Sequence, residues 1–339
     1  MREEAAAEPG PVALDAYGAD GGPELVLEGA RIAAERGAGV RLFGPPSLSG
    51  TPGVEIEPTG SWIPNEAEPV AAVRADPEAS VVLAAAAVAE GRCEALVSAG
   101  STGATMTAAL FALKRGQGVH RPALAAVIPV PNADRSLLFL DVGANTEVRP
   151  QHLIQFAFLG SAFSEAALGV DSPRVALLSV GEEQKKGRPD VVEAHEALKG
   201  AEGIEFIGNV EGRDLLSGTA DVVVTDGFTG NVTLKTLEGT ARAVAEAVRS
   251  AARSGPLAAA GGLLLRPALG GLRRDMDPNI AGGAILLGLR GVAVVAHGSS
   301  SAEGIANAVL LADRAVRERA VERTAELLAA SGATRSGLG

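Results

Sequence analysis

The chain has 339 residues, a formal net charge of −11 and one cysteine, Cys93. This acidic balance argues against a nucleic-acid binder that relies on overall positive charge, and a single cysteine excludes a disulfide framework and a cysteine-based zinc site. No apolar run reaches the roughly 18 residues of a membrane-spanning helix, and the acidic start Met1–Ala5 lacks the apolar core of a signal peptide. These features predict a soluble protein of a reducing compartment.

Strand-like and helical patterns alternate through the first half of the chain, after a lead over residues 1–10 that is expected to be disordered. Short apolar runs predict strands, and longer runs with helical spacing predict helices. The proline-containing residues 44–53 predict a loop. The predicted strands are 11–16, 40–43 and 94–98, and the predicted helices are 25–36, 70–73, 79–89 and 104–113.

The second half continues in the same way and ends in a long helix. Ser300 and Glu303 have the spacing of a capping box at the start of that helix. No long linker divides the chain, which favours interlocked subdomains over separate domains. The predicted strands are 137–140, 175–180, 221–225, 284–289 and 292–295, and the predicted helices are 152–168, 232–248 and 302–328.

The stretch Asp221–Val248 carries the strongest local signal. A β-branched strand ends at Asp226, the turn Gly227–Asn231 follows, and the next helix places Lys235 about one turn in. A strand, a glycine turn and a helix direct free N–H groups and a positive dipole end at one spot, which suits phosphate. The same design recurs at Glu94–Leu113. Several such turns at one sheet edge would form a site, whereas an ordinary βα connection is the alternative.

Residues 250–278 predict a protruding hairpin that is apolar and rich in arginine. Between residues 242 and 274, six arginines accompany a single glutamate, Glu246. An apolar run flanked by arginines in an acidic protein is typical of a membrane-surface contact, and this run is too short to cross. A pair of helices that pack a dimer is an equal alternative. The predicted membrane-contact residues are Leu263, Leu264, Leu265 and Arg266.

Several catalytic motifs are missing from the sequence. The spacings of a P-loop, of a dinucleotide-binding glycine loop after the first strand and of a nucleophile elbow do not occur. His195 and Glu196 begin an H-E-x-x-H pattern that lacks its second histidine. His297 ends an apolar strand beside glycine and serines. Asp141 and Asp226 are candidate bases or metal ligands, although carboxylates at strand ends often only fix a turn.

Five segments resemble, in their order along the chain, the motifs of the bacterial phosphate acyltransferases (PlsX type). The resemblance extends over about residues 12–309, and its longest motif, D-G-F-T-G-N-V-x-L-K-x-x-E-G, is specific. Ser101 departs from the family, which usually has asparagine at that position. The five segments are 98–104, 141–145, 181–187, 226–239 and 297–300.

The resemblance implies an α/β fold with three α/β/α layers and a mixed, mostly parallel sheet, similar to the isocitrate and isopropylmalate dehydrogenases and the phosphotransacetylases. It implies one catalytic domain of two entwined subdomains over residues 11–330, a flexible tail over 331–339, and a homodimer. The implied activity moves a fatty acyl group from acyl carrier protein to inorganic phosphate, giving acyl phosphate for phospholipid synthesis. The implied location is cytoplasmic, peripherally at the inner face of the membrane, with no cofactor, metal or nucleic acid.

Phosphate is itself the nucleophile in this reaction, so it needs a cradle for a dianion and donors for the thioester oxyanion, without an activated serine or cysteine. The acidic carrier protein needs a basic dock, for which Lys185, Lys186 and Arg188, or Arg273 and Arg274, are candidates. The hypothesised catalytic residues are Lys186, Asp226, Asn231, Lys235 and His297, and the phosphate-binding residues are Ser98, Gly100, Ser101, Thr102, Gly103, Asn145, Gly227, Thr229 and Gly230.

Three other functions remain open at this level. A short-chain phosphotransacylase that uses acyl-CoA would share the fold and the phosphate site without needing the hairpin. A nicotinamide-dependent decarboxylating dehydrogenase would need a metal-binding aspartate cluster and an adenine pocket, and the sequence has no clear spacing for either. A non-catalytic membrane adaptor would use the hairpin and leave the phosphate-type turns without a role.

Overall fold

The computed structural model describes residues 10–131, 133, 135–261, 264–265, 280 and 282–337. The expected disordered lead lies outside these residues except for Gly10, and so do Leu263, Arg266 and most of the predicted hairpin beyond residue 261. The described part of the expected flexible tail packs against the body of the protein. There the Arg335 N–H donates to the Gly118 carbonyl oxygen at 2.6 Å.

Strands form where apolar and β-branched residues run together, but the sequence patterns do not predict β3, β5 or β8. The residues of β5 are rich in alanine, which has little strand preference, and pairing with β6 and β10 holds them extended. The strands are β1 (Val12–Asp15), β2 (Val40–Gly44), β3 (Val54–Pro58), β4 (Ala95–Ser98), β5 (Ala123–Pro129), β6 (Ser136–Leu140), β7 (Arg174–Leu178), β8 (Glu205–Val210), β9 (Val222–Val224), β10 (Ala284–Leu287) and β11 (Val292–Val295).

Most predicted helices are present within two to three residues of their expected ends, and α6 is additional. The helices are α1 (Gly22–Glu35), α2 (Pro69–Ala75), α3 (Ser80–Ala89), α4 (Thr102–Leu113), α5 (Pro150–Leu168), α6 (Pro189–Leu198), the 3₁₀ helix η1 (Gly212–Asp214), α7 (Gly227–Ala252), α10 (Ala302–Arg317) and α11 (Ala320–Ala330).

The predicted helix over 302–328 is wrong as a single element, because Arg319 adopts a left-handed backbone (φ +52°) between α10 and α11. The predicted cap is also wrong. Ser301, one residue later than expected, accepts from the Gly304 N–H at 3.2 Å. Glu303 pairs with Arg36 at 2.8 Å, so its carboxylate joins α10 to α1.

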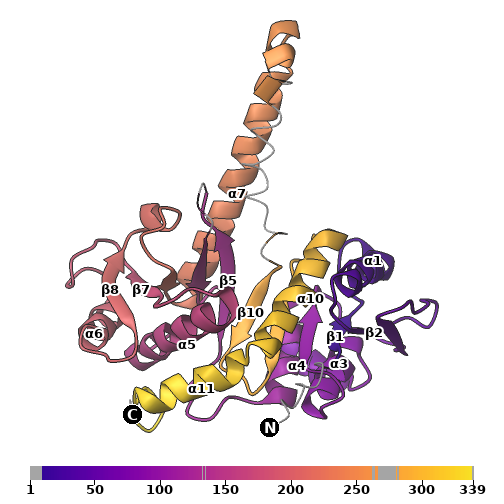
Figure 1. Ribbon diagram of the computed structural model, residues 1–339, viewed down its shortest axis with the longest axis horizontal. Coiled ribbons are helices and arrows are strands. Elements are labelled where there is room, and N and C mark those ends of the chain that lie inside the picture. Colours follow the sequence, from indigo (N-terminus) through magenta and orange to yellow (C-terminus); the bar gives the residue numbers. More distant parts are fainter. Residues whose placement is uncertain are drawn as a thin grey trace, which may run out of the picture.

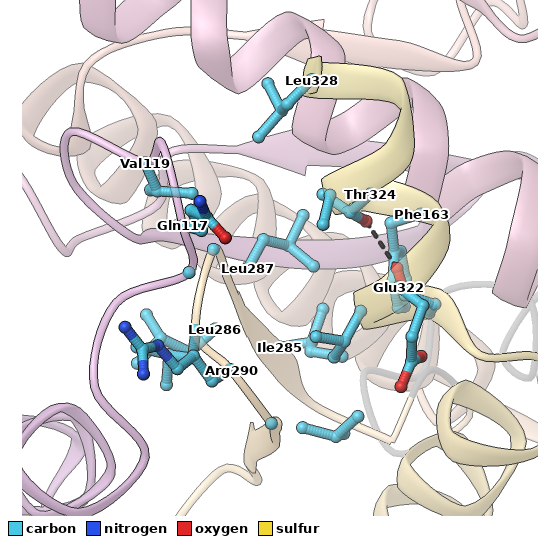
Figure 2. Close-up of a pocket in the computed structure, with 18 residues that line it drawn as sticks. Gln117, Val119, Phe163, Ile285, Leu286, Leu287, Arg290, Glu322, Thr324 and Leu328 are labelled. Atoms are coloured by element: carbon cyan, nitrogen blue, oxygen red, sulfur yellow. Dashed lines mark hydrogen bonds between the residues drawn. The ribbon is translucent and has the colours of Figure 1, made fainter. Parts of the chain in front are cut away.

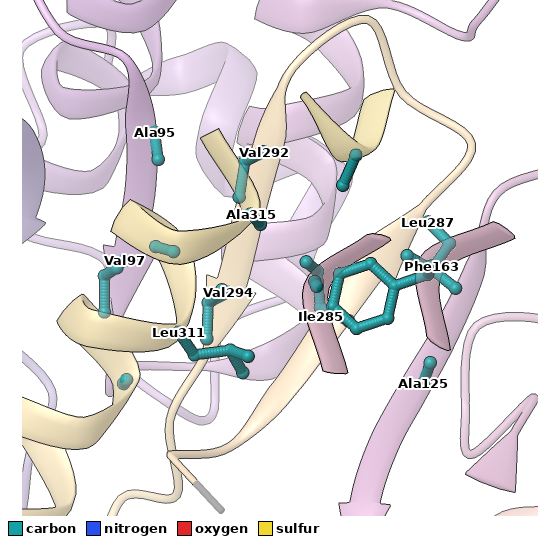
Figure 3. Close-up of a cluster of buried hydrophobic side chains, with 14 of the residues drawn as sticks. Ala95, Val97, Ala125, Phe163, Ile285, Leu287, Val292, Val294, Leu311 and Ala315 are labelled. Carbon is teal, nitrogen blue, oxygen red and sulfur yellow. The ribbon is translucent and has the colours of Figure 1, made fainter. Parts of the chain in front are cut away.

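Within the described residues the strands form one 11-stranded sheet in the order β3-β2-β1-β4-β11-β10-β5-β6-β9-β7-β8. One core cluster packs α1, α5, α6, α10 and α11 on one face, and a second packs α2, α3 and α4 on the other. Figure 3 shows Phe163 of α5 beside Ile285 and Leu287 of β10 in the first cluster. The three layers and the mixed, mostly parallel sheet confirm the predicted fold class.

The two halves of the sheet run in opposite directions. The three pairs between β11 and β6 are all antiparallel, whereas β1, β4 and β11 are parallel to one another, as are β6, β9 and β7. The carboxyl ends of β1, β4 and β11 therefore point in the direction opposite to those of β6, β7 and β9. The register nevertheless brings the two groups to one level of the sheet, because Val294 of β11 pairs with Ile285, Ile285 with Ala125, and Ala125 with Leu140 at the end of β6. The predicted strand-end turns of both groups therefore lie near one another, between the two halves of the sheet.

Helix α7 connects the two groups of turns. It begins directly after β9, so the predicted turn Gly227–Asn231 is in fact the first turn of the helix. Leu234 and Leu237 pack against the same core cluster as α4. Beyond them α7 leaves the body as a projecting arm (Figure 1), so the predicted protrusion begins earlier in the chain than residue 250.

Candidate active site

The carboxyl ends of β1, β4 and β11 meet in a cluster of turns, residues 16–22, 99–103 and 297–300, which we call the first half-site. The Asp20 N–H donates to the Gly298 carbonyl oxygen at 2.8 Å. A Cβ atom on Gly18, whose φ is +87°, would overlap Gly100 Cα. Glycine is required here because no side chain fits between the first two turns. The three turns therefore form one continuous surface.

Asp15 is the buried centre of the first half-site. Its carboxylate accepts from Ser80 Oγ at 2.6 Å and from Ser98 Oγ at 2.8 Å. Burial raises the pKa of Asp15 to about 6, against the lowering effect of these hydroxyl donors. The Ser98 hydroxyl also accepts from the Gly100 N–H at 3.1 Å. Ser98 and Gly100 therefore use these donors inside the turn, and their role as phosphate ligands stays a prediction.

The amino end of α4 is the part of the first half-site whose hydrogen-bond donors are not all used within the protein. Ser101 caps the helix by accepting from the Ala104 N–H at 3.4 Å, which leaves its own hydroxyl hydrogen available. In the described part of the chain, the N–H groups of Thr102 and Gly103 have no hydrogen-bond partner, as expected for the first turn of a helix. These groups lie where the helix dipole favours an anion.

The carboxyl ends of β6, β7 and β9 form the second half-site, residues 141–145, 226–230 and 181–188. Asp141 is fully buried and accepts five hydrogen bonds, from Leu124, Gly143, Ala144 and twice from Asn145. The Asn145 amide nitrogen also donates to the Pro122 carbonyl oxygen at 2.8 Å. Both amide hydrogens of Asn145 are thus engaged within the protein, and its role as a phosphate ligand stays a prediction.

Asp226 occupies the amino end of α7. Its carboxylate accepts from the Thr229 N–H at 2.9 Å, from the Thr229 hydroxyl at 2.7 Å and from Arg188 at 3.0 Å. The Gly227 N–H donates to the Asn145 carbonyl oxygen at 2.7 Å, and the Gly230 N–H to the Asp226 carbonyl oxygen at 2.9 Å. The protein's own carboxylate fills this helix end, so Asp226 is a cap and its arginine partner was not expected. The N–H groups of Gly227, Thr229 and Gly230 all have partners within the protein, and their role as phosphate ligands stays a prediction.

Lys235 and His297 join the two half-sites. Lys235 Nζ lies 3.4 Å from His297 Nε2 and 2.8 Å from Glu238. The Ser299 N–H, which can only donate, points at His297 Nδ1 at 3.2 Å. Nδ1 is the acceptor in that contact, which corresponds to the tautomer with its hydrogen on Nε2. In that tautomer an ammonium and an imidazole N–H face each other, an arrangement that an anion accepting from both would stabilise.

The remaining predicted residues lie further out. Asn231 is exposed and donates one amide hydrogen to the Val142 carbonyl oxygen at 3.1 Å. Lys186 is also exposed; its carbonyl oxygen accepts from Ser179 Oγ and its N–H donates to the Glu183 carbonyl oxygen at 2.9 Å. The 181–188 loop borders the second half-site through Arg188 and Asp226, and no contact brings Lys186 to the first. Cys93 is buried, and burial raises the pKa of its thiol to about 11.

Comparison with known proteins identifies the family. The model of a family described as "Fatty acid synthesis protein" matches residues 11–323. A phosphate acyltransferase of Elusimicrobium minutum is 45% identical over 316 residues, covering 90% of this chain and 92% of that protein. The chain belongs to the phosphate acyltransferase family. A second family member, from Lactococcus lactis subsp. cremoris, is 44% identical over 310 residues and covers 88% of this chain and 92% of its own length.

A solved structure confirms the fold at lower sequence identity. The EutD phosphotransacetylase from Staphylococcus aureus has a TM-score of 0.57 and 20% identity, and the match covers 91% of this chain and 94% of that one. The enzyme class and the resemblance to phosphate acyltransferases predicted from the sequence are thus confirmed: this chain is a phosphate acyltransferase. The roles of its individual site residues stay predictions.

Proposed function

We propose that this phosphate acyltransferase takes a fatty acyl group from acyl carrier protein and transfers it directly to inorganic phosphate, giving an acyl phosphate for phospholipid synthesis. The family assignment supports acyl transfer to phosphate. The observation that carries the proposal is the pair of donors Lys235 Nζ and His297 Nε2, 3.4 Å apart, beside the first half-site. With the free N–H groups of Thr102 and Gly103, they offer a cradle for a dianion.

In this proposal the first half-site positions both reactants. Phosphate lies against the amino end of α4 and Lys235, and one of its oxygens attacks the thioester carbon. The C–S bond breaks, and His297 Nε2–H stabilises the negative charge that develops on the carbonyl oxygen. The leaving thiol, with a pKa of about 8.5, needs little help from an acid. Holding the two reactants in the correct orientation supplies much of the rate acceleration of a reaction of this kind.

The proposed donor is tested by phosphate-dependent release of free thiol from a long-chain acyl carrier protein thioester, with acetyl-CoA as the parallel substrate. We expect release from the carrier protein thioester and little from acetyl-CoA. Preference for acetyl-CoA would instead favour the short-chain phosphotransacylase. Release from neither substrate would contradict the proposal. Lys185 and Lys186, both exposed on the 181–188 loop, are the proposed dock for the acidic carrier protein, so rising salt should weaken its binding.

We further propose that the arm formed by α7 and the residues beyond it binds the membrane surface and packs a homodimer. No helix in the described part of the chain is long and apolar enough to cross a bilayer. Near the end of the arm, Leu257 and Leu264 are 89% and 82% exposed, and Leu265 is also exposed. Val244 and Val248 of α7 are exposed as well, which leaves apolar surface for a second copy.

Changing Leu257, Leu264 and Leu265 to serine is expected to abolish flotation of the protein with anionic liposomes, because exposed apolar side chains and basic residues drive surface binding. The matched control changes the exposed Ile207, far from the arm in β8, to serine. Flotation that survives the triple change would leave dimer packing as the role of the arm. A monomer in sedimentation experiments would contradict the dimer.

A further inference from the structure

One hollow in the described structure lies away from both half-sites. It has a volume of about 410 Å³ and lies between the turn that joins β10 to β11, residues 288–291, and helix α11. Leu287 and Val292 mark this end of the two strands, whereas the first half-site adjoins the other end at Val295. Small-molecule sites typically have volumes of roughly 300–1,000 Å³.

The interior of this hollow is apolar. Ile285 and Leu287 of β10, Phe163 of α5 and Leu328 of α11 line it (Figure 2). Arg290 and Gln117 lie at one end of the view and Glu322 at the other. The hollow therefore offers an apolar middle with a cation at one mouth.

The basic mouth continues into a second hollow of about 340 Å³, which shares Arg290 with the first. Its lining adds Lys114, Arg115 and Arg335. No carboxylate of the described residues lies within 4.0 Å of any of these four cations. Within the described residues, the Arg115 and Arg290 side chains bond only to carbonyl oxygens, those of His120 and Arg115 respectively. In that part of the chain this cluster of cations has no ion-pair partner, although the net charge of the protein is −11.

The cations come from three separate segments, so they are not explained by one helix end. Lys114 and Arg115 follow the carboxyl end of α4, where the helix dipole favours cations. Arg290 comes from the β10–β11 turn and Arg335 from the C-terminal residues. Burial, together with the charges of Arg335 and Arg115, lowers the pKa of nearby His120. The fold thus brings the positive charges of Lys114, Arg115, Arg290 and Arg335 to one place.

We propose that this hollow and its mouth bind a single-chain amphiphile whose head group is a phosphate. The alkyl chain would occupy the apolar interior, and the guanidinium groups, which match phosphate geometry, would hold the head. The site is separate from the first half-site: α4 runs from Thr102 to Leu113 between them, a length of about 17 Å at the rise of an α-helix. Two sources supply this ligand chemistry: the enzyme's own acyl phosphate, which rests on the proposed function, and a lysophospholipid.

The test measures binding of dodecyl phosphate by calorimetry, below its micelle concentration. Two variants address the two halves of the site. The double change Lys114→Gln and Arg290→Gln removes charge from the mouth, and Ala325→Trp fills the hollow from an exposed position on α11. We expect each to weaken dodecyl phosphate binding at least tenfold. Dodecanol should lose affinity only in Ala325→Trp, because it has no phosphate.

Arg31→Gln, which removes an exposed charge from α1, is the matched control and should leave the affinity unchanged. Transferase activity should be unaffected in all variants, since none touches either half-site. Trp62, the only tryptophan, stacks on Tyr17 at the first half-site with 5.0 Å between ring centroids. Its fluorescence reports binding there and should not change when the remote site fills.

Unchanged dodecyl phosphate affinity in either variant would overturn the proposal. So would a change in Trp62 fluorescence that follows the binding curve, because the ligand would then lie in the first half-site. Loss of carrier-protein binding in the charge variant, with dodecyl phosphate binding intact, would make the mouth a protein dock and also contradict the proposal. Dodecanoyl lysophosphatidate that binds tenfold more tightly than dodecyl phosphate would identify a membrane lipid as the source; equal or weaker binding would identify the enzyme's product.

Discussion

Replacing Gly230 by alanine is expected to destabilise the protein by about 3 kcal/mol or more, because overpacking against a fixed backbone costs up to this amount and occasionally exceeds it. A Cβ atom at this position would overlap the Asp141 carbonyl oxygen and lie 3.0 Å from Thr225. Asp141 cannot move easily, because its carboxylate accepts five hydrogen bonds. Thr225 is fixed by backbone hydrogen bonds to Leu140 and Asp141. Unfolding by urea, followed by circular dichroism, measures the effect.

Gly239 provides a control in the same helix. It is exposed, and an added Cβ would meet nothing within 4 Å. Gly239→Ala is therefore expected to stabilise the helix by about 0.5–1 kcal/mol. If both changes have the same effect, the close approach of α7 to the 141–145 turn does not govern stability. Any loss of activity in Gly230→Ala beyond its loss of folded protein would show that this approach also aligns Lys235.

Replacing His297 by alanine is expected to lower kcat about 100-fold or more, the usual effect of removing one preorganised oxyanion donor. His297 Nε2 faces Lys235 and the position proposed for the substrates. Lys235→Ala should act mainly on the KM for phosphate, because the ammonium binds the dianion before as well as during the reaction. Steady-state thiol release at varied phosphate concentration separates the two effects.

Ser299 distinguishes direct transfer from a covalent route. Its hydroxyl lies 2.8 Å from His297 Nδ1, the distance of a serine nucleophile from its base. Ser299→Ala keeps the backbone N–H that orients the imidazole, so direct transfer predicts a loss of about tenfold or less, the worth of one hydrogen bond. Abolished turnover, together with an acyl-serine trapped in the wild-type protein, would overturn direct attack by phosphate.

Local patterns in the sequence identify much of the candidate site. His297 ends an apolar strand, and Lys235 follows a strand, a glycine-rich segment and a helix start, so both were recognisable without a structure. Their proximity was not, because they are 62 residues apart and lie beside different halves of the sheet. Ser80 has no sequence signal at all, yet it donates to Asp15. Arg188 was recognisable as a charge but not as the partner of Asp226.

The sequence by itself determined the α/β class, most of the strand and helix positions and the family, because these depend on local periodicity and on short specific motifs. Only the tertiary structure decided which turns retain free donors. Asp141 and Asp226 consume the donors of the second half-site, whereas α4 keeps the N–H groups of Thr102 and Gly103 free. The physical reason is that strand direction, register and hydrogen-bond partners are set by contacts distant in sequence. Three antiparallel pairs reverse the strand direction, and their register brings the ends of β11 and β6 to one level of the sheet, where α7 extends from one group of turns to the other.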